Sequence, residues 1–237
     1  MKSNVSQLKI KIFADGADIE GIKEAAANPL VRGFTTNPTL MRSAGLANCD
    51  YKQFALNVLE IAGDRPVSFE VFADDFPTME REAREIASWG ENVYVKIPVT
   101  NTKGEFSGPL IETLSSDRIK INVTAVFTRT QIFNIITALN PTVPSVISIF
   151  AGRIADTGRN PNEYMDFALR YLHIRPKTEL LWASPRELLN IFQADECGCH
   201  IITATNDIIK KLDLVGKDLD EYSLETVRMF HRDAVAL

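Results

Sequence analysis

Residues 92–100 read NVYVKIPVT. A short run this rich in valine and isoleucine predicts a buried β-strand, and Lys96 lies in its middle. Because side chains alternate along a strand, Lys96 shares one face with Tyr94, while Val95 and Ile97 point the other way. Burying a charged side chain is costly unless it is paired or neutralised. The presence of a lysine in this strand therefore indicates a structural or a chemical role.

Seven further apolar runs of this kind occur along the chain, and stretches with helical apolar spacing separate them. Eight strands alternating with helices predict an α/β fold, a (β/α)₈ TIM barrel that forms one domain over residues 1–237. The rival is a doubly wound open sheet, which favours a glycine-rich nucleotide loop that the sequence lacks. We expect strands at 8–13, 33–37, 67–72, 93–97, 119–127, 145–150, 179–184 and 200–204. We expect helices at 19–28, 51–63, 76–90, 107–116, 129–140, 160–173, 184–195, 206–216 and 220–236.

The composition is that of an ordinary globular protein of 237 residues, with 45% hydrophobic and 24% charged residues. The net charge of −5 argues against nucleic acid or an anionic membrane as the main partner. No apolar run approaches the ~18 residues of a membrane span, and the first residues do not resemble a signal peptide. The three cysteines have no framework spacing, which predicts free thiols and a cytoplasmic location. The C-G-C-H run at 197–200 has no second pair of ligands, so we expect no metal.

Polar residues cluster where the predicted strands end, and barrel enzymes carry their chemistry at these carboxyl ends. Ser68 and Glu70 share one strand face, as do Asn122 and Thr124. Together with Lys96 they bring a carboxylate, an amine, an amide and hydroxyls into one barrel mouth. The candidates of this group are Asp15, Thr35, Asn37, Ser68, Glu70, Lys96, Asn122, Thr124 and Ser148.

Two interpretations of Lys96 stay open on these residues alone. It can form a structural ion pair with Glu70 or Asp15 inside the barrel. Alternatively, burial lowers the pKa of its amine and leaves a neutral nucleophile that attacks a carbonyl group.

Arginines near two later strands suggest an anion site. Ser184, Pro185 and Arg186 have the pattern of a helix N-cap, a first-turn proline and a first-turn cation. A cation there opposes the helix dipole unless an anion is bound, and Arg153 follows the strand before it. Helix N–H groups with two guanidinium groups would suit a phosphate. The alternative is two surface arginines beside an ordinary cap.

At these residues the sequence resembles the transaldolase family, including its short branch of fructose-6-phosphate aldolase-like proteins. The matching segments keep the family order and cover most of the chain. They are Asp15, GFTTNP at 33–38, SFEV at 68–71, VKIPVT at 95–100, NVTAVF at 122–127, FAGRI at 150–154 and ASPR at 183–186.

The resemblance implies that Lys96 forms a Schiff base with a ketose and that Asp15 is the acid/base for the hydroxyl at the cleaved bond. It implies that Glu70 and Thr124 hold a catalytic water. The residues placed to contact the sugar are Thr35, Asn37, Ser68, Asn122 and Ser148. The phosphate group would be bound by Arg153, Ser184 and Arg186. Small sugar phosphates are the implied partners, and no metal or organic cofactor is required.

The family contains both transferases and lyases. Glu70 and Phe150 match the transaldolases, whereas the aldolase branch tends to carry glutamine and tyrosine, so we favour transfer of a dihydroxyacetone unit. Gly16 and Ala17 after Asp15, and proline at position 185, depart from the family pattern around the substrate. They leave open a non-standard anionic sugar. Two competing functions are a fructose-6-phosphate aldolase-like lyase and a non-catalytic barrel that binds sugar phosphates.

The last predicted helix, at about 220–236, has an apolar stripe that includes Leu224, Val227 and Phe230. It can cap its own barrel or reach a neighbouring molecule. We expect a homo-oligomer.

Overall fold

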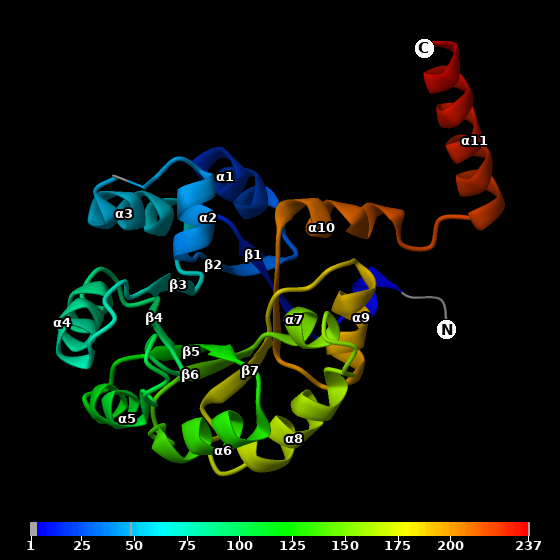
Figure 1. Cartoon of the computed structure of the whole chain (residues 1–237). Coiled ribbons are helices and arrows are strands. Elements are labelled where there is room, and N and C mark those ends of the chain that lie inside the picture. The colour runs from blue at the N-terminus through cyan, green and yellow to red at the C-terminus, as the bar shows by residue number, and fades with distance from the viewer. Residues whose placement is uncertain (1–3, 48, 237) are drawn as a thin grey trace.

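The computed structural model describes residues 4–47 and 49–236. Eight parallel strands form a closed barrel in sequence order, with the last strand paired to the first. This confirms the predicted (β/α)₈ barrel and rules out the open doubly wound sheet (Figure 1). The strands are β1 (Lys11–Asp15), β2 (Val31–Thr35), β3 (Val67–Glu70), β4 (Val93–Pro98), β5 (Ile121–Val126), β6 (Ser145–Ile149), β7 (Thr178–Trp182) and β8 (Ile201–Ala204).

Helices surround the barrel, except for α11, which extends away from it (Figure 1). They are α1 (Ile19–Ala27), α2 (Pro38–Ser43), α3 (Tyr51–Ala62), α4 (Phe76–Ala87), α5 (Gly108–Ser116), α6 (Arg129–Ala138), α7 (Ala151–Ala155), α8 (Asn162–Leu172), α9 (Leu189–Glu196), α10 (Asn206–Lys210) and α11 (Leu219–Val235). Two 3₁₀ turns, η1 (Val5–Gln7) and η2 (Lys211–Leu214), complete the elements. Side chains of Asp18, Asp50 and Asp75 accept hydrogen bonds from the first turns of α1, α3 and α4 and so fix where these helices begin.

The main hydrophobic core lies between the strands and the helices. Val95 and Ile97 of β4 belong to it and are fully buried, as their predicted outward direction requires. The barrel interior holds a second, smaller apolar cluster that includes Phe13, Leu181 and part of Tyr94. Gly33 gives this cluster room, because a Cβ at that position would lie 2.5 Å from the Phe13 ring. The polar residues of the site therefore rest on a packed apolar layer.

Several predicted boundaries were wrong. β1 begins and ends later than residues 8–13, so Asp15 is its last residue and does not follow it. β2 covers residues 31–35 and not 33–37, because the chain turns into the unpredicted helix α2 at Pro38. The short helix α7 was also missed. The predicted helix 206–216 divides into α10 and the 3₁₀ turn η2.

The predicted helix at 184–195 begins at Leu189, five residues later than expected. Ser184 adopts φ +61°, in the left-handed region, and is not an N-cap. The prediction of a Ser-Pro-Arg helix start was therefore wrong. Local propensity suggested a cap, but the chain after β7 forms a loop that packs against α7.

Helix α11 begins at Leu219, close to the prediction, and extends away from the barrel (Figure 1). None of its described residues is buried. It therefore does not cap its own barrel. In the described part of the chain, no helix has the length and apolar character needed to cross a bilayer. Cys49, Cys197 and Cys199 carry free thiols.

Candidate active site

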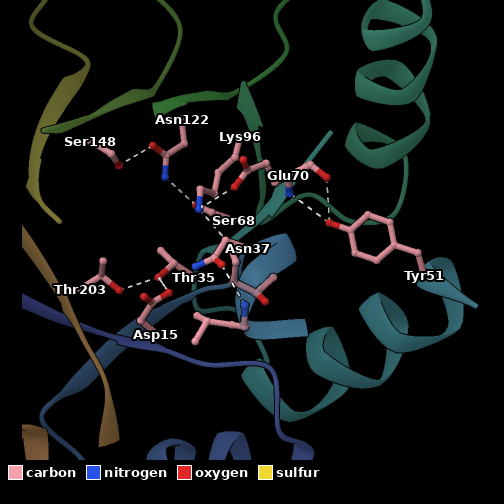
Figure 2. Close-up of polar contacts among 12 residues, drawn as sticks. Asp15, Thr35, Asn37, Tyr51, Ser68, Glu70, Lys96, Asn122, Ser148 and Thr203 are labelled. Atoms are coloured by element: carbon pink, nitrogen blue, oxygen red, sulfur yellow. Dashed lines mark hydrogen bonds and ion pairs between the residues drawn. The ribbon is translucent and has the colours of Figure 1, made fainter. Parts of the chain in front are cut away.

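Lys96 lies in the mouth of the barrel, where adjacent strands place it directly beside Glu70. Its side chain amine donates a hydrogen bond to the carbonyl oxygen of Thr36 at 2.8 Å, and its Nζ lies 3.1 Å from Oε2 of Glu70 (Figure 2). Lys96 is 6% exposed and the Glu70 side chain 14% exposed. The predicted burial of Lys96 is thus confirmed, and of the two ion-pair partners considered, Glu70 is the one in contact.

Asp15 faces the same space from β1. Thr35 donates a hydrogen bond to its Oδ1 at 2.7 Å, and the hydroxyls of Thr35 and Thr203 are 2.5 Å apart (Figure 2). Burial raises the pKa of the Asp15 carboxyl group above its usual value, while the Lys96 charge and the Thr35 hydroxyl act against that rise. A carboxyl group whose pKa is raised is a stronger base when ionised, which suits a group that accepts and returns a proton.

A hydrogen-bonded chain beneath the mouth links side chains of β3, β5 and β6, and so reaches across the intervening strand β4. Asn122 donates from Nδ2 to Oγ of Ser68 at 3.0 Å and accepts at Oδ1 from Ser148 at 2.7 Å (Figure 2). All three side chains are buried. The chain fixes the orientation of the Asn122 amide, as buried polar groups require.

Two other predicted residues have free polar atoms. The Thr124 hydroxyl is buried and has no hydrogen-bond partner among residues 4–47 and 49–236, and Thr124 lines the mouth. Asn37 accepts a hydrogen bond from the backbone of Leu40 and so caps α2. Its Nδ2 makes no hydrogen bond within the described segments. A hydroxyl and an amide N–H are therefore available for water or for a polyhydroxylated ligand.

One cavity of about 440 Å³ is lined both by the predicted residues around Lys96 and by the predicted arginines. Ser68 and Asn122 lie beneath its surface and support Ser148. The predicted residues that line it are Asp15, Thr35, Asn37, Glu70, Lys96, Thr124, Ser148, Phe150, Arg153, Ser184 and Arg186.

The side of the cavity formed after β6 and β7 carries what we call the arginine strip, namely Arg153, Ser184 and Arg186. The guanidinium carbon of Arg153 lies 5.4 Å from the centre of the Phe150 ring. Arg186 forms an ion pair with Asp156. The backbone N–H groups of residues 186 and 187 donate to Oδ1 of Asn190, at 2.7 and 3.2 Å. These two N–H groups are therefore not left open for an anion, and the predicted contribution of helix N–H groups does not hold at residues 186 and 187.

Sequence reasoning missed three residues that shape the site. Thr203 lines the cavity, and the alternation of the strand at 200–204 could have placed it on the inner face. Tyr51 accepts a hydrogen bond from the backbone N–H of Glu70 and donates to its carbonyl oxygen, each at 3.0 Å (Figure 2). Nothing in the local sequence indicated this contact from α3. Asp156 forms an ion pair with Arg186. From the sequence, its position three residues after Arg153 suggested only that it stabilises the loop containing Arg153.

The fold and the site define a (β/α)₈ barrel with a lysine–carboxylate ion pair and a second carboxyl group, that of Asp15, in its mouth. The sequence profile described as Transaldolase/Fructose-6-phosphate aldolase matches residues 12–237, and the chain belongs to this family. It is accordingly an enzyme of the aldolase type.

Named relatives agree with this family assignment, and solved structures share the fold. A protein named "Probable transaldolase" from Methanococcus maripaludis (strain C5 / ATCC BAA-1333) is 34% identical over 204 residues, covering 86% of this chain and 89% of the relative. A "Probable transaldolase" from Thermoanaerobacter sp. (strain X514) is 32% identical with the same coverage. Dihydrodipicolinate synthase from Thermotoga maritima superposes with a TM-score of 0.60 at 14% identity, covering 94% of this chain and 80% of that one. N-acetylneuraminate lyase from Mycoplasma synoviae gives 0.56 at 13% identity, covering 96% and 81%. At such identities the two structures show a common fold.

Proposed function

We propose that this protein transfers a dihydroxyacetone unit from a ketose phosphate to an aldose phosphate through a Schiff base on Lys96. The observation that carries the proposal is the placement of the Lys96 amine. It lies in a buried mouth, 3.1 Å from the Glu70 carboxylate and on the same cavity as Asp15. An amine in contact with a carboxylate can pass its proton to that partner before it attacks a carbonyl carbon.

The first half of the reaction cleaves the donor. Nζ of Lys96 adds to the ketose carbonyl carbon C2, and loss of water gives an iminium ion. Glu70 and Thr124 would hold the water that carries protons in this step, which is supported by the Thr124 hydroxyl having no partner among residues 4–47 and 49–236. Asp15 accepts the proton of the C4 hydroxyl, the electrons of the C3–C4 bond move into the iminium, and an aldose leaves. A three-carbon enamine stays on Lys96.

The second half decides between transfer and hydrolysis. In transfer, the enamine attacks an acceptor aldehyde, Asp15 returns its proton, and water releases the new ketose. In the lyase alternative, the enamine is protonated and hydrolysed with no acceptor. Phe150 lines the cavity and offers no hydroxyl for placing water beside the enamine, which supports transfer. The measurement that separates them is donor turnover with and without an acceptor aldose.

The sugar itself is bound from two sides in this proposal. The Asn37 amide and the Ser148 hydroxyl face the part of the cavity around Lys96 and suit the hydroxyls of the three-carbon unit. Arg153 and Arg186 lie on the far side and suit the terminal phosphate. Gly16 and Ala17, together with Pro185 in the arginine strip, keep open a non-standard anionic sugar.

Borohydride trapping tests the covalent step. The protein is incubated with fructose 6-phosphate, reduced, digested and searched for a mass adduct. A three-carbon adduct on Lys96 is the expected result, and it shows both Schiff-base formation and cleavage. A six-carbon adduct would mean binding without cleavage and would argue against the role of Asp15. No adduct with any ketose would overturn the catalytic mechanism and leave Lys96 as a structural partner of Glu70.

We further propose that the protein forms a homo-oligomer through α11. This helix has 17 residues, buries none of them on its own barrel, and exposes Leu224, Val227 and Phe230. Apolar side chains exposed along one helix mark an interaction surface. Light scattering of the full chain and of a variant ending at residue 218 tests this. Equal masses per particle, after correction for the missing helix, would contradict it.

A further inference from the structure

We propose that Asp156 is a positioning residue of the arginine strip: its carboxylate holds the Arg186 guanidinium so that the free Nη1 edge is presented to the anionic end of the substrate. The inference rests on the proposed function only in taking that strip as the anion site of the substrate cavity. The exposed ion pair between Asp156 and Arg186 takes no part in the bond-making and bond-breaking steps of the proposed reaction.

The close approach of α7 to the loop after β7 brings the two residues together. A Cβ added to Gly152 would lie 1.6 Å from the carbonyl oxygen of Ser184 and 3.5 Å from Nε of Arg186. Only glycine permits this approach. Asp156 follows Gly152 by four residues, and its N–H donates to the Gly152 carbonyl oxygen at 2.9 Å. It therefore lies on the same side of the turn and faces the same loop.

The contact uses one edge of the guanidinium group. Nε of Arg186 lies 3.1 Å from both carboxylate oxygens of Asp156, and Nη2 donates to Oδ2. Nη1 makes no hydrogen bond within residues 4–47 and 49–236. Arg186 also lines the substrate cavity. A two-point contact on one edge fixes the guanidinium plane, and the remaining donors keep the paired geometry that suits phosphate or another oxyanion.

The pair contributes little to the stability of the fold. The side chains of Arg186 and Asp156 are 48% and 51% exposed, and exposed ion pairs are screened by water and salt. The Arg186 side chain hydrogen bond is the main cause of a lowered pKa of Asp156, so the carboxylate stays ionised at neutral pH. Its benefit is therefore expected in binding, where an arginine already held in place loses less conformational freedom.

Charge and position predict opposite results when Asp156 is neutralised. If Asp156 only competes with the substrate anion for Arg186, then Asp156→Asn raises the local positive charge and strengthens anion binding. If it positions Arg186, the same change loosens the guanidinium group and weakens binding. We expect the second result, with an increase of about tenfold in the dissociation constant, the size expected from poorly oriented charge-assisted hydrogen bonds.

The experiment titrates inorganic phosphate and, separately, inorganic sulfate into the full-length protein by calorimetry, and measures KM and kcat for fructose 6-phosphate. Asp156→Asn and Asp156→Ala should weaken anion binding and raise KM about tenfold while kcat changes little. In an Arg186→Ala background the same changes should have no further effect, because Asp156 acts through Arg186.

The matched control is Asp117→Asn. Asp117 is also 51% exposed, and it pairs with Arg84 at 2.7 Å. The Asp117→Asn substitution changes the net charge by the same amount as Asp156→Asn and should leave anion binding unchanged. Three results would overturn the proposal: binding that is unchanged or tighter in Asp156→Asn, an Asp156 effect that persists without Arg186, or saturable binding of neither anion by the unmodified protein. Failure of the Schiff-base mechanism would appear separately, as a missing Lys96 adduct with anion binding intact.

Discussion

The two sides of the cavity are built in different ways. The side around Lys96 consists mainly of buried or partly buried strand residues joined by hydrogen bonds, such as Thr35 to Asp15 at 2.7 Å. The arginine strip consists of loop and short-helix residues, and its ion pair from Arg186 is half exposed. Charges on the first side interact strongly because water is largely excluded, while those on the second are screened.

This difference assigns different tasks to the two sides. Buried polar residues joined by hydrogen bonds hold nearby groups in one geometry and cannot be changed without cost to the fold. An exposed strip on loops can change its residues at little structural cost.

Lys96→Met should give the largest effect. It removes the proposed nucleophile, so the borohydride adduct should disappear and turnover should fall by at least about 10⁴-fold. It also leaves the buried Glu70 carboxylate without its partner, which should lower the free energy of unfolding by about 3–5 kcal/mol. Denaturant unfolding and adduct mass spectrometry measure the two effects.

Combining Lys96→Met with Glu70→Gln separates chemistry from folding. The double variant no longer contains the unpaired charge and should regain most of the lost stability, but none of the turnover. Substantial turnover in either variant would show that Lys96 is not the nucleophile.

Arg186→Ala should affect binding and spare the fold. Loss of charge-assisted hydrogen bonds worth about 1.5–3 kcal/mol should raise KM for a ketose phosphate by about 10- to 100-fold. The free energy of unfolding should change by less than about 1 kcal/mol, because the guanidinium group is half exposed. Steady-state kinetics and thermal unfolding test both statements. A large loss of stability would contradict the division between the two sides of the cavity.

Asn122→Ala tests the buried side of the cavity, where a substitution should lower stability. Its removal leaves the hydroxyls of Ser68 and Ser148 without their shared partner in a buried position, which should cost about 1–3 kcal/mol in unfolding free energy. Ser148→Ala breaks a single bond of the same chain and should cost less. Equal stability of Asn122→Ala and the unmodified protein would show that the chain is not a structural support.

The two sides also differ in how well the sequence predicted them. Alternation along a strand fixes the direction of each side chain, so the burial of Lys96 beside Glu70 followed from the sequence. The conformation of a loop depends on what it packs against. Ser184 was therefore wrongly predicted as a helix cap, because its left-handed φ and the contact with Gly152 come from tertiary packing. The same holds for Asp156, which meets Arg186 only across two loops.

Thr35→Val should give the smallest effect and the finest test of the buried side. Burial raises the pKa of Asp15. Thr35 donates a hydrogen bond to the Asp15 carboxylate and thereby opposes that rise. Valine keeps the shape but not the donor, so the pKa of Asp15 should rise further. Asp15 must be ionised to accept the C4 hydroxyl proton, so the acidic limb of the kcat/KM profile should move to higher pH. The matched control is Thr203→Val, which keeps the bond from Thr35 to Asp15 and should leave that limb in place. If the limb moves equally in both variants, or moves to lower pH in Thr35→Val, the acidic limb does not report Asp15, and the proton acceptor must be sought elsewhere in the mouth.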